Sequence, residues 1–128
     1  MRIKSVQAWW VRIPIEVAKQ HRSDFGQVTT FDAAILRIEQ IYPFPENSLG
    51  RLLRPYKKAE VIWCQEEPEN MGAWHFVDRR IDRALAGIDV KAKRPNYIGR
   101  PEAASPATGS ARTHLKEQAE LVDRALTI

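Results

Sequence analysis

The sequence predicts an α/β domain with three layers, in which helices cover both faces of a short, mostly parallel sheet. Apolar runs of strand length alternate along the chain with segments whose apolar residues recur every three or four positions. This alternation is typical of a wound α/β structure with right-handed crossovers. The 128 residues are enough for one compact core and too few for several.

Four segments are expected as strands, at residues 2–15, 33–41, 61–64 and 97–98. The first is rich in Val, Ile and Trp, and Pro14 ends it or places it at a sheet edge. The second is a nearly continuous apolar run, which is typical of a parallel strand covered on both faces. The polar stretch at residues 19–30 is expected as a loop or a long hairpin connection. We expect residues 3–13 to pair antiparallel with residues 33–39 at the edge of the sheet.

Three helices are expected, each from an apolar stripe on one face. A short helix runs through the leucines of residues 49–53, and Asn47 or Ser48 caps its start. The second helix has its apolar residues at spacings of three and four, and Gly87 ends it. The third carries a similar stripe. The stripe residues are Trp74, Val77, Ile81 and Leu85 in the second helix and Leu115, Ala119, Val122 and Leu126 in the third.

The charge pattern argues against nucleic-acid and membrane partners. The formal net charge is +4, but Lys and Arg are interleaved with Asp and Glu. The longest basic cluster is Lys91, Lys93 and Arg94, with no series of aromatic residues around it. No segment has the length of a membrane span, and the N-terminus lacks the apolar core of a signal peptide. The chain is therefore expected in the cytoplasm.

The cysteine and histidine residues predict no metal site. Cys64 is the only cysteine, so an internal disulfide and a thiolate metal cage are excluded. It lies in the apolar run at residues 61–64, where we expect a buried and unreactive side chain. His21, His75 and His114 do not have the spacing of metal ligands.

The densest group of carboxylates is Glu66, Glu67 and Glu69, just past the end of a strand, where α/β folds often bind ligands. A catalytic pair would need one desolvated carboxylate, and an acidic turn before a helix is the interpretation that we favour. The turn at residues 99–109 could in principle cradle a phosphate, but it lacks the Lys-Ser/Thr of a Walker loop, so a structural turn is favoured.

The sequence therefore predicts no catalytic, cofactor-binding or metal-binding residue in this chain. Partly exposed aromatic residues can bury a large area against a partner. Tyr42 and Trp74, together with Glu66 and Glu67, are the candidates for an interface.

Five motifs follow one another in a fixed order within residues 33–128. They are Tyr42-Pro43-Phe44-Pro45, Trp63-Cys64-Gln65-Glu66-Glu67-Pro68, Gly72-Ala73-Trp74, Tyr97-Ile98-Gly99-Arg100-Pro101 and Ser105-Pro106-Ala107-Thr108-Gly109. This series closely resembles the C-terminal end of the thiamine-diphosphate-dependent first component of 2-oxoglutarate dehydrogenase. The resemblance implies a fold like the C-terminal domain of transketolase. The activity it implies for the family is oxidative decarboxylation of 2-oxoglutarate with succinyl transfer to lipoamide, in the tricarboxylic acid cycle.

The same resemblance implies cofactors and partners. Thiamine diphosphate and magnesium would be bound in earlier domains of the full-length family, and none in this chain. The partners implied are a second copy, in a homodimer, and the dihydrolipoyl succinyltransferase component.

Residues 1–39 are similar to a different family. The strand through Val11-Arg12-Ile13-Pro14, the loop from His21 to Gly26 and the return strand ending Leu36-Arg37-Ile38-Glu39 resemble the N-terminal capping segment of the enolase superfamily, in its mandelate racemase and muconate lactonizing branch. The resemblance implies that the loop with His21 covers the substrate of a separate barrel. We therefore expect a fusion with its seam near residues 31–39, and two segments, 1–32 and 33–128.

The function expected from these observations is a C-terminal fragment of the dehydrogenase first component that is a non-catalytic scaffold or dimerisation domain. Two alternatives stay open at this point. One is the remnant of a capping domain from an enolase-superfamily sugar-acid dehydratase or racemase. The other is a basic nucleic-acid binder, which would show salt-dependent retention on DNA or RNA.

Overall fold

The computed structural model describes residues 6–14, 21–23, 26–28, 30–38 and 40–126, with the side chains of residues 33–38 and 40–126. The chain separates into two compact units, Met1–Glu39 and Gln40–Ile128. Each unit is described by itself. The predicted boundary between residues 32 and 33 depends on a family resemblance and stays a prediction.

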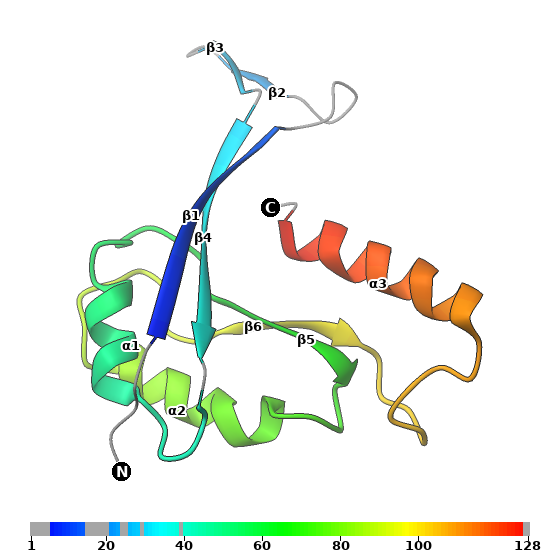
Figure 1. Cartoon of the computed structure of the whole chain (residues 1–128). Coiled ribbons are helices and arrows are strands. Elements are labelled where there is room, and N and C mark those ends of the chain that lie inside the picture. Colours follow the sequence, from blue (N-terminus) through cyan, green and yellow to red (C-terminus); the bar gives the residue numbers. More distant parts are fainter. Residues whose placement is uncertain (1–5, 15–20, 24–25, 29, 39, 127–128) are drawn as a thin grey trace. The chain divides into compact units, whose positions relative to one another are not determined.

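The first unit is built on one antiparallel strand pair (Figure 1). Its strands are β1 (Val6–Pro14), β2 (His21–Ser23), β3 (Gly26–Val28) and β4 (Thr30–Ile38). β1 pairs with β4 so that Val6 lies opposite Ile38, and β2 and β3 form a small hairpin. The predicted antiparallel pairing is confirmed for residues 6–11 with residues 33–38. Residues 3–5 and 39, also part of that prediction, lie outside the described residues.

The environment predicted for residues 33–41 is wrong. β4 ends at Ile38 and forms a two-stranded antiparallel sheet with β1, instead of lying in a parallel sheet. Ile35 is 46% exposed, so the strand is not covered on both faces. A short run of apolar residues is compatible with a buried parallel strand and with one strand of a ribbon, and the pattern alone cannot separate the two.

The second unit has three layers. Its elements are α1 (Glu46–Leu53), β5 (Ile62–Pro68), α2 (Trp74–Ala86), β6 (Asn96–Arg100) and α3 (Ala111–Leu126). β5 and β6 form a parallel pair, with Ile62 opposite Asn96. α1 packs on α2, and α3 packs on β5 and β6, on the other side of the strands from α2 (Figure 1). The predicted class, an α/β fold with a short parallel sheet and an N-terminal antiparallel strand, is confirmed.

The core of the second unit lies on the predicted face of α2. Val77, Ile81 and Leu85 are all buried, and Ala84 completes the buried face. Leu49 and Leu53 of α1 are buried as well, which is consistent with the packing of the two helices. The helix ends at Gly87 as predicted, where the backbone N–H of Gly87 donates to the carbonyl oxygen of Arg83.

The predicted cap of α1 is wrong. The helix begins at Glu46 after Pro45, and Asn47 and Ser48 lie inside it without acting as its side-chain cap. The carbonyl oxygen of Pro45 accepts the backbone N–H of Leu49 at 2.9 Å, so proline starts the hydrogen-bonded turn. The Glu46 carboxylate in the first turn is favourable for the helix dipole, which reduces the need for a capping side chain.

The predicted buried stripe of α3 is also wrong. Leu121 is the one buried residue of this helix, while Leu115 and Val122 are exposed. The half-buried residues include His114 and Glu117, both of which contact Arg100 of β6. Polar contacts therefore orient this helix, and its apolar stripe points elsewhere.

Candidate functional site

Two polar side chains are buried in the described part of the chain, and both lie on the parallel strands. Gln65 in β5 is 8% exposed, and Arg100 at the end of β6 is 6% exposed. Cys64, predicted to be buried, is exposed instead. Alternate residues of a strand point to opposite faces, so burial of Gln65 turns its neighbour Cys64 outward.

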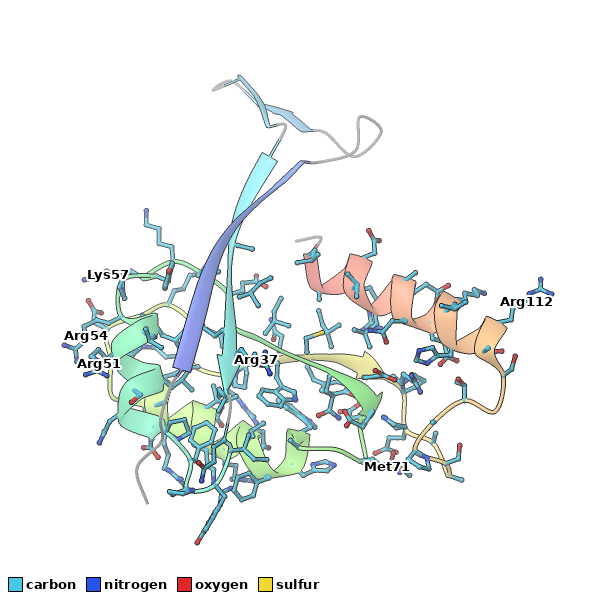
Figure 2. All side chains as sticks on the ribbon, viewed as in Figure 1. Arg37, Arg51, Arg54, Lys57, Met71 and Arg112 are labelled. Carbon is cyan, nitrogen blue, oxygen red and sulfur yellow. The ribbon has the colours of Figure 1, made fainter. Side chains whose placement is uncertain are left out.

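The Gln65 side chain connects the turn after β5 to the start of α2. Its Nε2 lies within hydrogen-bond distance of three backbone carbonyl oxygens. These belong to Glu67 at 3.3 Å, Pro68 at 3.2 Å and Met71 at 2.8 Å. Its Oε1 accepts from the Trp63 indole N–H at 2.9 Å and from the backbone N–H of Trp74 at 3.1 Å. Met71 lies in the turn between β5 and α2 (Figure 2), so a single amide holds both ends of that turn.

Gly72 allows this turn to close over Gln65. Its φ of +67° lies in the left-handed region, where residues with a Cβ atom are strained. A Cβ atom at this position would lie 2.9 Å from Nε2 of Gln65 and 3.1 Å from Cβ of Glu67. The close packing and the positive φ both require glycine.

Substitution Gly72→Ala is expected to lower the free energy of unfolding by about 1–2 kcal/mol, because a left-handed conformation costs a non-glycine residue about that much. Urea unfolding followed by tryptophan fluorescence would measure the loss. Gly109→Ala is the matched control, since a Cβ atom there meets nothing within 4 Å. We expect the control to change stability by less than about 0.5 kcal/mol, and equal losses at the two positions would contradict the role given to Gly72.

Tyr97 links the Gln65 turn to the end of β6. Its hydroxyl lies 3.1 Å from the carbonyl oxygen of Glu67 and 3.1 Å from that of Arg100. Its ring packs against the Trp74 ring with centroids 5.2 Å apart. Burial raises the pKa of Tyr97, so the hydroxyl stays protonated and able to donate at neutral pH.

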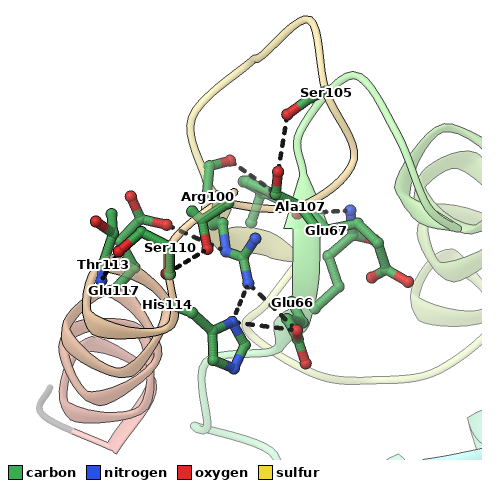
Figure 3. A network of polar contacts seen from close by, with 12 residues as sticks. Glu66, Glu67, Arg100, Ser105, Ala107, Ser110, Thr113, His114 and Glu117 are labelled. Atoms are coloured by element: carbon green, nitrogen blue, oxygen red, sulfur yellow. Dashed lines mark hydrogen bonds and ion pairs between the residues drawn. The ribbon is translucent and has the colours of Figure 1, made fainter.

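Arg100 connects both strands to α3 (Figure 3). Its Nη2 donates to Oε1 of Glu66 in β5 at 3.2 Å and to Nδ1 of His114 in α3 at 3.1 Å. Its Nε forms an ion pair of 3.4 Å with Oε2 of Glu117, also in α3. We refer to Arg100, Glu66, His114 and Glu117 as the Arg100 cluster.

The Arg100 cluster fixes the role of the His114 ring. An arginine side chain can only donate, so Nδ1 of His114 must accept and, in the neutral ring, the proton lies on Nε2. Nδ1 also lies 3.7 Å from Oε1 of Glu66. The Arg100 guanidinium thus contacts two carboxylates and an imidazole. Its positive charge is therefore compensated by side chains of the chain itself.

A shallow recess of about 160 Å³ lies beside the Arg100 cluster. Its walls come from the end of β5, the end of β6, the following loop and α3. The lining residues are Pro68, Arg100, Pro101, Ala103, Ser105, Ala107, Thr108, Gly109 and Glu117. Because Glu66 and Glu117 already neutralise Arg100, the recess has no surplus positive charge for an anionic ligand. The interpretation of this loop as a structural turn stays a prediction.

The predicted interface residues occupy different surroundings. Tyr42 is 73% exposed, and its ring lies 6.4 Å from that of Phe76. Trp74 is half-buried against Tyr97, while Glu66 and Glu67 are exposed beside Gln65. Only Glu66 of the four joins the Arg100 cluster, and the use of these residues in an interface stays a prediction.

The other candidate residues also have defined places. His75 is exposed at the start of α2, and Glu69 is half-buried in the turn, where its backbone N–H donates to Arg100. The side chain of His21 lies outside the described residues. Within the described ranges, no three His, Cys, Asp or Glu side chains gather in a way that could hold a metal ion.

Sequence reasoning missed Gln65 and Arg100. Gln65 interrupts a strand whose other early residues are apolar, and an uncharged polar residue at such a position signals a buried hydrogen-bonding role. Arg100 gave no local signal, because its partners Glu66 and His114 are 34 and 14 residues away along the chain.

Comparison with known proteins gives one consistent family. A model of the family described as "2-oxoglutarate dehydrogenase C-terminal" matches residues 15–126. Among curated proteins, the 2-oxoglutarate dehydrogenase E1 components of Brucella anthropi, Brucella ovis and Brucella canis are each 50% identical over 95 residues. The match covers 74% of this chain but 10% of each relative. The chain therefore spans about a tenth of the length of these relatives.

The family match extends into residues 1–39, the segment predicted from the sequence to belong to the enolase superfamily. It begins at residue 15, whereas the predicted seam lies near residues 31–39. The comparisons give no support to a fusion with an enolase-superfamily segment, or to the alternative of a remnant capping domain.

Proposed function

Because the chain belongs to the 2-oxoglutarate dehydrogenase C-terminal family, we propose that its own role is assembly and that it performs no step of the dehydrogenase reaction. The relatives that it matches are named E1 components, and oxidative decarboxylation of 2-oxoglutarate is the activity that the resemblance implies for such proteins. In this proposal, the chain supplies a packed terminal domain, and the reaction takes place elsewhere in a full-length relative.

One observation carries the proposal. The two buried polar side chains of the described residues, Gln65 and Arg100, bind groups of the chain itself. Catalytic polar groups need free donors, acceptors or protons directed at a substrate. Here the amide holds a turn, and the guanidinium holds α3 against the strands.

Under this proposal, the chain itself does not hold thiamine diphosphate or magnesium. A magnesium ion that bridges phosphate groups takes carboxylate oxygens of the protein as ligands. Two of the described carboxylates, Glu66 and Glu117, are paired with Arg100, and among the described residues no three His, Cys, Asp or Glu side chains gather in a way that could hold a metal ion. We therefore derive no reaction step from these cofactors in this chain.

Isothermal titration calorimetry with thiamine diphosphate and magnesium is expected to show no binding at micromolar concentration. Incubation with 2-oxoglutarate, the cofactors and an artificial electron acceptor is expected to give no turnover above a protein-free blank. A full-length E1 component from one of the Brucella relatives serves as the positive control in both assays. Micromolar cofactor binding or measurable decarboxylation by the purified chain would overturn the proposal.

The partners and the location follow from the same proposal. A second copy of the chain is the partner that an assembly role requires first, and the dihydrolipoyl succinyltransferase component stays a prediction made from the family resemblance. Among the described helices, none combines the length and the apolar character that crossing a bilayer demands. The cytoplasmic location stays a prediction.

A further inference from the structure

Two basic stretches that are distant in the sequence meet at one end of the second unit. Residues 51–60 lead from α1 toward β5, and residues 88–96 lead from α2 to β6. The backbone N–H of Lys91 donates to the carbonyl oxygen of Lys57 at 2.7 Å, so the two stretches lie side by side. They meet where the parallel strands begin, at the opposite end of the sheet from the Arg100 cluster.

The charge on these two stretches is one-sided. Together they hold seven basic side chains and two acidic ones, whereas the remainder of residues 40–128 holds seven basic and ten acidic ones. All seven basic residues are exposed. Figure 2 shows Arg51, Arg54 and Lys57 extending from α1 and the loop after it. We refer to the Lys and Arg residues of positions 51–58 and 91–94 as the basic edge.

Most of the charge on the basic edge is not neutralised within the described part of the chain. Lys57 pairs with Asp89 at 2.9 Å, and Arg94 pairs with Asp82 at 3.4 Å. The other basic side chains of the edge form no ion pair among the described residues. Like charges that lie close together repel each other and destabilise the folded chain. A partner that brings carboxylates to this edge would remove that repulsion.

A recess of about 150 Å³ opens on the basic edge. Lys91 and Arg94 supply cations to its lining, and Ala59, Val61 and Ala92 supply an apolar part. The recess therefore offers space for one aliphatic side chain, with cations beside it for flanking carboxylates.

The composition of the edge favours an acidic polypeptide over a nucleic acid. Glu60 lines the recess, and Asp89 lies beside Lys57. A continuous phosphodiester backbone would meet these carboxylates, whereas a peptide can place its separate acidic side chains beside the cations alone. Tyr56 is the only aromatic residue of the two stretches, so no series of aromatic rings is present on which bases could stack.

We propose that the basic edge is a docking surface for an acidic segment of another polypeptide. The segment places carboxylates beside Arg51, Arg54, Lys58 and Lys91 and one aliphatic side chain in the recess. The inference goes beyond the proposed assembly role, because it names a partner of opposite charge in addition to a second copy. Contacts between exposed charges are individually weak, so the dissociation constant is expected on the order of 10–100 μM at low salt.

Fluorescence anisotropy with a labelled peptide tests the proposal on the whole chain. The probe is a short glutamate peptide with one central leucine, and the same peptide with glutamine in place of glutamate is the uncharged reference. The acidic probe is expected to bind in about 50 mM salt and about tenfold more weakly in about 300 mM salt, since salt screens exposed charges. Absence of binding at low salt, or equal binding of the uncharged reference, would overturn the proposal.

A variant with four substitutions locates the binding surface. Arg51→Gln, Arg54→Gln, Lys58→Gln and Lys91→Gln together are expected to weaken binding of the acidic probe at least about tenfold. These side chains are exposed and form no ion pair among the described residues, so the urea midpoint is expected to match that of the wild type.

The matched control removes the same charge elsewhere. Arg79→Gln, Arg112→Gln, Lys116→Gln and Arg124→Gln change four exposed residues outside the basic edge. This control is expected to bind the acidic probe within about twofold of the wild type. An equal loss in the two variants would overturn the assignment to the basic edge.

The recess has a test of its own. Ala92→Tyr places a larger side chain in it, which is expected to weaken binding of the leucine-containing probe about fivefold. A probe made of glutamate alone is expected to bind this variant as it binds the wild type, which also shows that the variant is folded. Equal effects on the two probes would overturn the role of the recess.

DNA oligonucleotides with the same net charge as the peptide decide the class of partner. Single-stranded and duplex DNA are both expected to bind more weakly than the acidic probe. Tighter binding of DNA that is lost in the variant with four substitutions would overturn the acidic polypeptide in favour of a nucleic acid. The calorimetric test of cofactor binding is independent of these results, so a failure of this inference and a failure of the proposed function are distinguishable.

Discussion

Substitution Gln65→Glu is expected to lower the free energy of unfolding by about 3 kcal/mol, because it removes a buried donor and directs a carboxylate oxygen at backbone carbonyls. The two side chains have the same shape, so packing is unchanged and the loss reports the hydrogen bonds. Nε2 of Gln65 lies within 3.3 Å of three carbonyl oxygens, none of which can donate to the introduced carboxylate. Urea unfolding followed by the fluorescence of Trp63 and Trp74, which both bond to Gln65, would measure the effect.

The loss of stability caused by Gln65→Glu is expected to become smaller as the pH falls. The introduced carboxyl is buried among acceptors, which raises its pKa in the folded state above that in the unfolded state. The folded variant therefore binds the proton more tightly, and its stability deficit relative to the wild type is expected to shrink as the pH falls toward 5 and below. A deficit that grows on acidification would contradict the assigned hydrogen bonds.

Glu67→Gln is the control for the Gln65 experiment. Glu67 lies two residues along the same strand, and its side chain is exposed. The exchange makes the opposite change of charge at the surface, and we expect it to alter the stability by less than about 0.5 kcal/mol. A loss below about 1 kcal/mol for Gln65→Glu, at neutral pH, would show that the turn does not depend on this amide.

Substitution Arg100→Met is expected to cost about 2–3 kcal/mol and to loosen α3 selectively. Methionine keeps much of the volume of the buried side chain, while the contacts to Glu66, His114 and Glu117 are lost. The partner carboxylates can turn to water because they are partly exposed, which keeps the loss below that of a fully buried ion pair. Hydrogen exchange followed by mass spectrometry would localise the change.

The expected pattern is faster exchange in residues 111–126 with little change in α2, which is held by apolar packing. Arg94→Met is the matched control, because Arg94 pairs with Asp82 at 3.4 Å but is 71% exposed. Exposed ion pairs contribute about 0–1 kcal/mol, so this control is expected to leave stability and exchange almost unchanged. Equal effects of the two substitutions would contradict the role of the Arg100 cluster.

The helices illustrate what the sequence could and could not predict. For α2, most of the apolar stripe coincides with the buried face, because Val77, Ile81 and Leu85 pack into the core. For α3, the prediction from the apolar stripe fails. The buried Arg100, which precedes the helix in another element, contacts His114 and Glu117 and so holds their face of the helix inward. Periodicity finds both helices but cannot predict which face a distant charge will hold.

For the strands and the candidate site, the local pattern was also predictable, whereas contacts between distant residues were not. The pairing of residues 6–11 with 33–38 was predictable, because two apolar segments are joined by a polar connection. It was not predictable that this pair forms a sheet of its own, because an apolar run is compatible with a buried parallel strand and with a strand of a two-stranded ribbon. Glu66 was predicted just past the end of a strand, which is wrong, because β5 continues to Pro68 and contains it. Its pairing with Arg100 links residues 34 positions apart and needs the fold to be known.

The exposed position of Cys64 makes the chain easy to label at one defined atom. It is the only cysteine, so a maleimide dye or spin label attaches at a single site without any further substitution. Partial burial raises the pKa of this thiol, so less thiolate is present at neutral pH and conjugation proceeds faster in mildly alkaline buffer. A probe attached there sits one residue from Gln65 and can report opening of the β5 turn by a change in its emission or its motion.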